Sequence, residues 1–221
     1  MNDHGAAAQQ KTADFFDRAR AHLSLDVPPA LIDPTAQGIR RGDLDLDPTS
    51  WERAGVSATR PASVLVPVID RSEATVLLTQ RTAELASHAG QVAFPGGKID
   101  PNDESPVAAA VREAKEEVGL APVLVEPIGY LDLYLTFSGF RILPTVARVK
   151  PDFALTLNPR EVTEAFEVPL AFLMDPANHQ RKTRDWNGIQ REYYAMPFEN
   201  RYIWGITAGI LHNLYERVYS A

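Results

Sequence analysis

Residues 96–120 read GGKIDPNDESPVAAAVREAKEEVGL, and this stretch decides most of what the sequence predicts. Ser105 is a residue type that caps helix N-termini, and Pro106 suits the first helical position, where its missing N–H is not needed. Gly119 tolerates the left-handed conformation that commonly ends a helix. The stretch therefore predicts a helix over residues 106–118.

This helix is predicted to have one apolar side and one charged side. The apolar residues recur at three-to-four spacing, so that this side can pack against a sheet. They are Val107, Ala110, Val111, Ala114 and Val118. Glu113 lies off this stripe, close to Glu116 and Glu117, with no lysine or arginine at the expected partner position. Like charges at one-turn spacing repel each other, so the three acids need an explanation.

Two interpretations of the three glutamates stay open on composition alone. They can form a water-facing acidic surface, stabilised by a pair between Arg112 and Glu116. They can instead bind Mg²⁺ or Mn²⁺, which are hard ions that prefer oxygen ligands and can bridge to substrate phosphates. Gly96 and Gly97 allow the backbone to approach the same place. The gathering of acids favours the metal site.

The composition is that of an ordinary globular protein. The chain has 221 residues, of which 45% are hydrophobic and 23% charged, so it can bury a real core. It contains no cysteine, which excludes disulfides, thiolate nucleophiles and Cys-based metal sites. The net charge of −7 argues against a nucleic-acid-coating surface, and no apolar run approaches a bilayer span. The N-terminus lacks the order of a secretion signal, so we expect a cytoplasmic protein.

Apolar periodicity predicts the remaining elements. Helices are expected at residues 6–23 and 205–218. Strands are expected at residues 62–69, 75–79, 124–135, 142–149 and 192–196, with the first two forming a hairpin or near-hairpin. This mixture indicates an α/β or α+β fold in which helices cover a mixed sheet. Residues 1–60 are expected to be an N-terminal helix and Pro-rich arm, and residues 61–221 the main domain. Within the arm, the alternating acids are interpreted as a solvated loop: Asp43, Asp45 and Asp47.

Residues 97–120 resemble the Nudix box, the signature of enzymes that hydrolyse nucleoside diphosphates linked to another group. The run Arg-Glu-apolar-x-Glu-Glu-x-Gly-apolar is matched at every position by residues 112–120, and seven residues separate Glu104 from Arg112. One spacing departs from the signature, because six residues rather than five separate Gly97 from Glu104. The resemblance implies a Nudix-type α/β/α sandwich with a mixed central sheet.

Flanking segments resemble a Nudix subgroup, the coenzyme A pyrophosphatases. Residues 77–81 and 90–97 are similar to the subgroup motif, although Thr82 replaces the usual Ser or Ala and Ala86 replaces the usual Arg. The resemblance implies cleavage of CoA, or of its acyl or oxidised forms, into 4′-phosphopantetheine and adenosine 3′,5′-bisphosphate. Two alternatives are a Nudix pyrophosphatase for ADP-ribose or another dinucleotide, and a non-catalytic Nudix-like nucleotide sensor. The implied partner is a small nucleotide, with no nucleic acid or membrane, and the chain would be a monomer or homodimer.

The resemblance also implies individual roles. The metal ligands for Mg²⁺ or Mn²⁺ would be Glu113, Glu116, Glu117 and the Gly97 carbonyl. The catalytic set would comprise Glu113, Glu116, Arg112 and Glu104. Within it, Arg112 would orient Glu104 and Glu116 rather than contact the substrate. The general base can be one of the helix glutamates, or an acid in the loop-like segment after Asn158, where Glu161 and Glu164 are candidates. Either of these two can equally be a solvated loop acid.

Other candidate site residues have two interpretations each. Arg81 follows a strand and, with Gly96, can contact a substrate phosphate, or it can form a structural ion pair. Four aromatic residues can stack on adenine, although core positions are commoner for such residues: Tyr193, Tyr194, Phe198 and Trp204. A basic stretch can contact the 3′-phosphate of CoA or form a solvent-facing hairpin rim, which we favour: His179, Arg181, Lys182 and Arg184.

Overall fold

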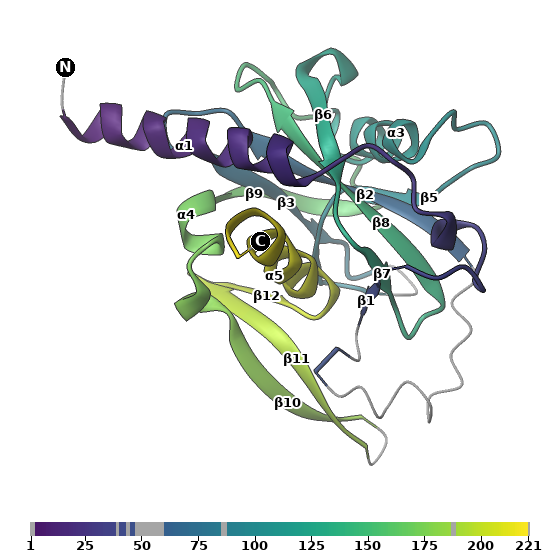
Figure 1. Ribbon diagram of the computed structural model, residues 1–221. Coiled ribbons are helices and arrows are strands. Elements are labelled where there is room, and N and C mark those ends of the chain that lie inside the picture. Colours follow the sequence, from purple (N-terminus) through teal and green to yellow (C-terminus); the bar gives the residue numbers. More distant parts are fainter. Residues whose placement is uncertain are drawn as a thin grey trace.

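The computed structural model describes residues 3–38, 40–42, 45–46, 60–84, 88–186 and 189–220. Within these residues, helices cover both faces of a mixed sheet (Figure 1). The sheet is built from β1 (Arg40–Gly42), β2 (Arg60–Ile69), β3 (Thr75–Arg81), β4 (Val92–Ala93), β5 (Gly96–Lys98), β6 (Val125–Tyr130), β7 (Leu133–Leu135), β8 (Phe140–Val149) and β9 (Val162–Pro169). The predicted α/β/α sandwich with a mixed sheet is confirmed.

The order of the strands centres the sheet on β2. A continuous path runs β1-β7-β8-β2-β3-β4, while β5 pairs with β2, β6 with β8 and β9 with β3. Strands β2 and β8 are parallel, and β2 and β5 are antiparallel. The predicted near-hairpin is present, although β2 and β3 pair only at Val68 with Val76 and at Ile69 with Thr75. Because β5 lies along β2, it carries Gly96 and Gly97 to the helix that packs on this strand.

Alternate residues of β2 supply two apolar layers. Leu65 and Ile69 belong to the cluster that includes α3 (Pro106–Val118), whereas Val66 and Val68 belong to the cluster that includes α1 (Asp3–His22) and α5 (Ile206–Tyr219). Successive strand residues face opposite sides of a sheet, so one strand can support a core on each face. Figure 1 shows α1 and α5 near each other.

A second, three-stranded antiparallel sheet extends from the body of the molecule. It consists of β10 (Gln180–Trp186), β11 (Ile189–Phe198) and β12 (Arg201–Trp204). The short α4 (Leu170–Leu173) and a 3-10 turn at Pro176–Asn178 connect it to β9. Two other 3-10 turns lie at Pro29–Leu31 and Pro122–Leu124. The hairpin of β10 and β11 projects away from α3 in Figure 1.

The predicted ends of α3 are confirmed. The Ser105 hydroxyl accepts a hydrogen bond of 3.1 Å from the backbone N–H of Ala108, and Pro106 is the first helical residue. Gly119 ends the helix with a φ of 74°, and a Cβ there would lie 2.9 Å from the backbone nitrogen of Thr156. Both the left-handed backbone and the close approach of the next loop therefore require glycine.

Two strand predictions needed correction. The strand expected at residues 124–135 is two strands, because the chain turns at Leu131 and Asp132, where Asp132 binds Asn213 and Arg217 of α5. Strand β9 occupies part of the segment that was expected to be loop-like. Its outward residues are polar, and its pairing with β3 comes from a distant part of the chain.

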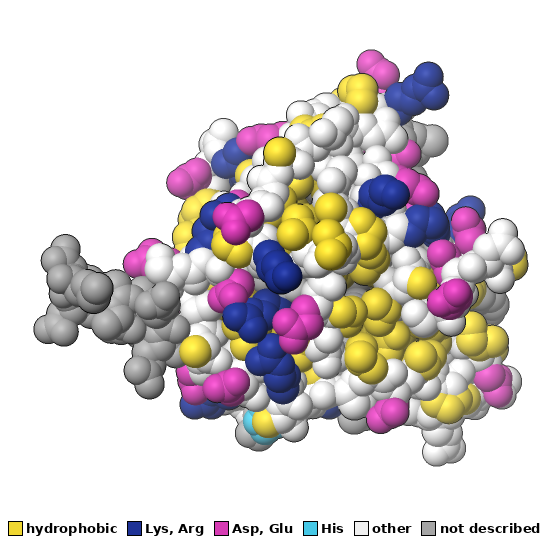
Figure 2. Space-filling model, turned by 90° about the horizontal axis from the view of Figure 1, so that it is seen from above, with side chains coloured by type: hydrophobic (Ala, Val, Ile, Leu, Met, Phe, Trp, Pro, Cys, Tyr) yellow, Lys and Arg dark blue, Asp and Glu magenta, His cyan; other side chains and the backbone are white. Residues whose placement is uncertain are grey.

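The N-terminal helix packs onto the core. Phe15 and Phe16 of α1 are buried in the cluster that also includes residues of α5. On the surface, Arg20 of α1 forms an ion pair of 3.0 Å with Glu126 of β6. Figure 2 shows basic and acidic side chains side by side on the upper face of the molecule. Among the described residues, no helix is long and apolar enough to cross a membrane.

Candidate active site

The strand β5 lies directly beside the acidic side of α3. The Ser63–Gly97 register pair places β5 along β2, and α3 packs over both strands. A Cβ at Gly97 would lie 2.5 Å from Oε1 of Glu113. The Glu113 carboxylate therefore occupies the space that a side chain at residue 97 would fill, and its own side chain is only 17% exposed.

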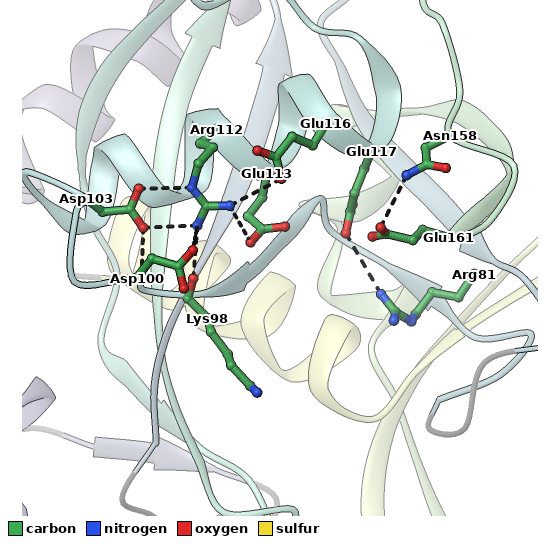
Figure 3. A network of polar contacts seen from close by, with 10 residues as sticks. All are labelled: Arg81, Lys98, Asp100, Asp103, Arg112, Glu113, Glu116, Glu117, Asn158 and Glu161. Atoms are coloured by element: carbon green, nitrogen blue, oxygen red, sulfur yellow. Dashed lines mark hydrogen bonds and ion pairs between the residues drawn. The ribbon is translucent and has the colours of Figure 1, made fainter.

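Glu117 is the most deeply buried acid of the site. Its side chain is 3% exposed, and Oε1 lies 3.9 Å from Nη1 of Arg81 at the end of β3 (Figure 3). Burial raises the pKa of Glu117 to about 8, against the opposing effects of Arg81 and a backbone hydrogen bond from Gly96. Burial also raises the pKa of Glu113. A nearby cation is the simplest way to keep two such carboxylates ionised at neutral pH.

Arg112, in the middle of α3, joins this helix to the loop before it. Its Nε and Nη2 atoms each donate a hydrogen bond of 3.0 Å to the Asp103 carboxylate, and Nη2 also donates to the Lys98 carbonyl at 3.2 Å (Figure 3). The paired hydrogen bonds lower the pKa of Asp103. In addition, Nη1 contacts Glu113 at 2.9 Å and Glu116 at 3.3 Å.

These contacts correct two expectations. Arg112 was expected to orient Glu104, but Glu104 is exposed and Asp103 takes its place. The reason lies in the loop, where the Asp103 carboxylate accepts a hydrogen bond from the Asp100 backbone and so turns toward the helix. Glu113 does have a cationic partner, because the guanidinium of Arg112 reaches it from the adjacent position.

The three helix glutamates do not point the same way. The side chains of Glu113 and Glu117 are largely buried. The Glu116 side chain is 57% exposed and contacts Arg112 (Figure 3). Among the described residues, no group of three or more acids or histidines is already close enough to hold a metal ion. The donor chemistry nonetheless fits Mg²⁺ or Mn²⁺, because two poorly hydrated carboxylates face the glycine backbone of β5.

The two loop acids considered as a general base are in different places. Glu161 lies in the turn before β9 and accepts a hydrogen bond of 3.2 Å from the Asn158 side chain. The backbone of Asn158 in turn donates to the Glu117 carbonyl, which holds this turn against the end of α3. Figure 3 shows Asn158 and Glu161 on this turn, near Glu117. Glu164 lies on β9 and pairs with Arg201 of β12. The structure therefore brings Glu161, and not Glu164, to the buried carboxylates.

Comparison with known proteins places this geometry in a family. The family model of the NUDIX domain matches residues 59–188, which include β5, α3 and the turn that carries Glu161. The chain belongs to the Nudix family. Two curated relatives, both called uncharacterized Nudix hydrolase NudL, come from Photorhabdus laumondii and Yersinia pestis. Both are 41% identical to this chain. The match covers 72% of this chain and 85% of the Photorhabdus protein, and 73% of this chain and 82% of the Yersinia protein.

Solved Nudix structures also resemble the chain. A Nudix hydrolase from M. smegmatis, RenU, is 25% identical, and the match covers 52% of this chain and 73% of the RenU chain, with a TM-score of 0.41. A MutT/nudix family protein from Enterococcus faecalis is 14% identical, and the match covers 80% of this chain and 70% of that protein, with a TM-score of 0.46. Membership of the family assigns pyrophosphohydrolase activity on a nucleoside diphosphate derivative, and Nudix hydrolases generally use divalent ions such as Mg²⁺ or Mn²⁺.

A cavity of about 730 Å³ lies beside β5, and none of its lining residues in the described part of the chain belongs to α3. Arg81, Gly96, Gly97 and Lys98 line one part of its wall, and residues of β11, β12 and α5 line other parts. The Nε atom of Arg81 is buried and has no hydrogen-bond partner among the described residues. Arg81 pairs with Glu117 and also lines the cavity, so both of its predicted interpretations stay open.

The predicted aromatic set divides around this cavity. Tyr193 and Trp204 line it as a T-shaped pair, with ring centroids 5.4 Å apart. Tyr194 stacks on His212 at 4.0 Å, while Phe198 packs against Phe172. Tyr194 lines the cavity as well, so three of the four rings are available to a ligand, and Phe198 packs against the core.

The basic stretch also divides. Arg181 pairs with Glu192 at 2.8 Å, and His179 contacts His212 at 2.9 Å. Lys182 is exposed, in agreement with a solvent-facing rim, but Arg184 lines the cavity. In the arm, Arg41 and Asp45 contribute to the cavity wall. The positions of Asp43, Asp47 and Ala86 lie outside the described residues.

Two residues of the candidate site, Asp103 and Arg191, were missed in the sequence analysis. Asp103 could have been found from the spacing, since five residues separate it from Gly97, as the Nudix signature expects. Arg191 of β11 could not have been found in this way, because its place on the cavity wall depends on how the second sheet packs.

Proposed function

We propose that this Nudix chain hydrolyses the pyrophosphate bond of coenzyme A, or of its acyl or oxidised forms, to give 4′-phosphopantetheine and adenosine 3′,5′-bisphosphate. One observation carries the chemistry: Glu113 lies against Gly97, Glu117 accepts a backbone hydrogen bond from Gly96 and pairs with Arg81, and both glycines and Arg81 line a large cavity. The resemblance of residues 77–97 to coenzyme A pyrophosphatases supports the choice of substrate.

The proposed metal site uses the acids of α3. Glu113 and Glu117 would hold Mg²⁺ or Mn²⁺, with Glu116 and the Gly97 carbonyl as further ligands. When bound, such an ion neutralises a diphosphate and lowers the pKa of a water molecule toward neutrality. Glu116 is exposed and pairs with the flexible side chain of Arg112, so its carboxylate can turn toward the site.

Arg112 and Asp103 act as positioning residues in this proposal. The two parallel hydrogen bonds from Arg112 to Asp103 fix the plane of the guanidinium, as bidentate pairs do. The remaining nitrogen, Nη1, then holds the carboxylates of Glu113 and Glu116 on the same side of the helix. Glu104 has no part in this arrangement.

Arg81 and Glu161 are the proposed substrate-facing groups. Arg81 would donate hydrogen bonds to a diphosphate oxygen, because its guanidinium borders the cavity with one nitrogen free to donate. Glu161 would accept the proton of the attacking water, since its turn is held beside Glu117. Gly96 would act indirectly, through its backbone hydrogen bond to Glu117.

A substrate panel with Mg²⁺ or Mn²⁺ tests the proposal. The purified chain would be incubated with CoA, ADP-ribose, NADH and nucleoside triphosphates, and the products separated by chromatography. We expect CoA to be the best substrate and to yield the two named products. Turnover of ADP-ribose but not CoA would replace this proposal with the dinucleotide alternative, and no turnover of any compound would favour a nucleotide sensor.

A further inference from the structure

Two arginines of the β10–β11 hairpin lie opposite each other on the cavity wall. Arg184 of β10 is paired in register with Arg191 of β11, and both line the cavity that Gly96 and Gly97 of β5 also line. Like charges directly opposite each other in a sheet repel and reduce stability. A negatively charged ligand group at this place would be attracted by both guanidinium groups.

A contact with the main sheet fixes the position of Arg191. Its guanidinium carbon lies 3.8 Å from the ring centroid of Phe137, in the turn between β7 and β8, and Phe137 also lines the cavity. A cation over an aromatic ring is attracted to it while its N–H groups stay free to donate at the ring's edge. This contact therefore holds a hydrogen-bond donor at the cavity without neutralising its charge.

Glu192, the acid next to Arg191 in the sequence, does not cancel the positive charge of Arg191. Glu192 follows Arg191 and also lines the cavity, but its carboxylate forms an ion pair of 2.8 Å with Arg181. The charge of Glu192 is therefore already compensated within the hairpin. The net charge of the whole chain, with Arg184 and Arg191 counted, is −7, so these two arginines are not part of a generally basic surface.

The arginine pair lies away from the proposed site of hydrolysis. In Figure 1 the strands β10 and β11 extend away from α3. The rings of Tyr193 and Trp204 belong to the same small sheet and line the same cavity. A ligand with its diphosphate beside Glu117 would therefore present a different group to the arginines, with a base or another flat group available to the rings.

We propose that Arg184 and Arg191 form a subsite for a phosphomonoester that the substrate carries apart from its scissile diphosphate. This inference rests on the proposed function, because the 3′-phosphate on the ribose of CoA is such a group, and it names the residues that recognise that group. Guanidinium groups match the geometry of phosphate oxygens, and two of them can neutralise the phosphate dianion.

Product binding tests the subsite without any need for turnover. The affinity of the full chain for adenosine 3′,5′-bisphosphate and for adenosine 5′-monophosphate would be measured by calorimetry. We expect the bisphosphate to bind about tenfold more tightly or better, as one charge-assisted contact allows. The double substitution Arg184→Gln with Arg191→Gln should bring this ratio close to one. Equal affinities in the unsubstituted chain would overturn the subsite.

Lys182→Gln is the matched control. Lys182 lies on the same strand as Arg184, and its replacement removes one positive charge, as Arg184→Gln does. Lys182 does not line the cavity, so the ratio should be unchanged. A similar loss of the ratio in this variant would show a general charge effect and overturn the proposal. If the double substitution unfolds the chain, Arg184→Gln alone tests the proposal. Because the Arg184 side chain is exposed, its replacement should lower the affinity ratio without loss of the fold.

Kinetics then separate the subsite from the proposed function. The ratio of kcat/KM for CoA to that for dephospho-CoA, which lacks the 3′-phosphate, should fall about tenfold in the double variant and stay constant in Lys182→Gln. Preferential bisphosphate binding without hydrolysis of either compound would support the subsite and reject the proposed function. Equal binding of the two nucleotides with hydrolysis of both compounds would support the function and reject the subsite.

Discussion

The guanidinium of Arg112 donates two parallel hydrogen bonds of 3.0 Å to the carboxylate of Asp103. The same guanidinium contacts Glu113, whose carboxylate lies over Gly97. The loop before the Nudix helix is thereby connected to the acid that faces β5. This chain of contacts gives the first prediction, because neutralising Asp103 should free the guanidinium to move.

We expect Asp103→Asn to lower kcat by about tenfold to a hundredfold, since an amide can accept only one of the two hydrogen bonds and lacks the charge. Steady-state kinetics on the best substrate would measure this effect. Glu104→Gln, one residue away and exposed, is the matched control and should change kcat less than twofold. A larger loss from Glu104→Gln than from Asp103→Asn would reverse our assignment of the positioning acid.

Gly97→Ala should reduce activity with little loss of stability. The new Cβ would lie 2.5 Å from Oε1 of Glu113, so the carboxylate, which is the end of a flexible side chain, has to move away. We expect at least a tenfold loss of kcat/KM and a melting temperature within a few degrees of the original. Gly38→Ala is the control, because its Cβ would meet only Ala30 at an ordinary 3.8 Å. Full activity in Gly97→Ala would show that the position of Glu113 is unimportant.

Substitution of the two loop acids should give opposite results. Glu161→Gln is expected to lower kcat by about a hundredfold or more, because a general base typically contributes at least that factor. Glu164→Gln removes an ion pair with Arg201 on the surface of β9, so it should alter stability by at most about 1 kcal/mol and leave kcat nearly unchanged. Comparable kcat values for Glu161→Gln and the original chain would exclude Glu161 as the base.

His212 predicts a pH dependence of stability. Its ring stacks on Tyr194, and burial, helped by the charges of His179 and Arg41, lowers its pKa to about 4. The unfolded chain, with a histidine pKa of about 6.5, therefore binds more protons between these two values. The free energy of unfolding should be highest above pH 6.5 and fall by up to about 3 kcal/mol as the pH decreases through 4.

Urea unfolding at several pH values between 7 and 4 would measure this dependence in the original chain and in His212→Phe. Phenylalanine keeps a ring against Tyr194 but cannot titrate, so the decrease between pH 6.5 and 4 should become shallower by an amount close to the His212 contribution. An identical pH profile for the two proteins would mean that His212 does not keep its lowered pKa in the folded state.

Local signals explain which parts of the fold were predictable. The ends of α3 depend on Ser105, Pro106 and Gly119, which act on neighbouring backbone groups, and both ends were predicted correctly. Strand β9 was missed because Glu164 and Glu167 interrupt its apolar pattern, while its stability comes from pairing with β3 far away in the sequence. Residues that act through distant partners leave no such local signal.

The candidate site shows the same distinction. The signature identified the acids of α3, but not that Glu116 would point outward while Glu117 is buried, since only the packing of β5 and the Asn158 turn decides this. The register of the loop was also ambiguous by one residue, and a backbone hydrogen bond from Asp100 selects Asp103. Cavity residues on β11 depend entirely on tertiary packing.

Manganese binding tests the central claim most directly, because Mn²⁺ in solution gives an electron paramagnetic resonance signal that is lost on binding to protein. Titrations would compare the original chain with Glu117→Gln, and with Glu104→Gln as the control acid. We predict that Glu117→Gln weakens Mn²⁺ binding at least tenfold, since an amide is a poor ligand for a hard cation, and that Glu104→Gln does not. Equal Mn²⁺ affinity in the original chain and in a folded Glu117→Gln variant would contradict the account.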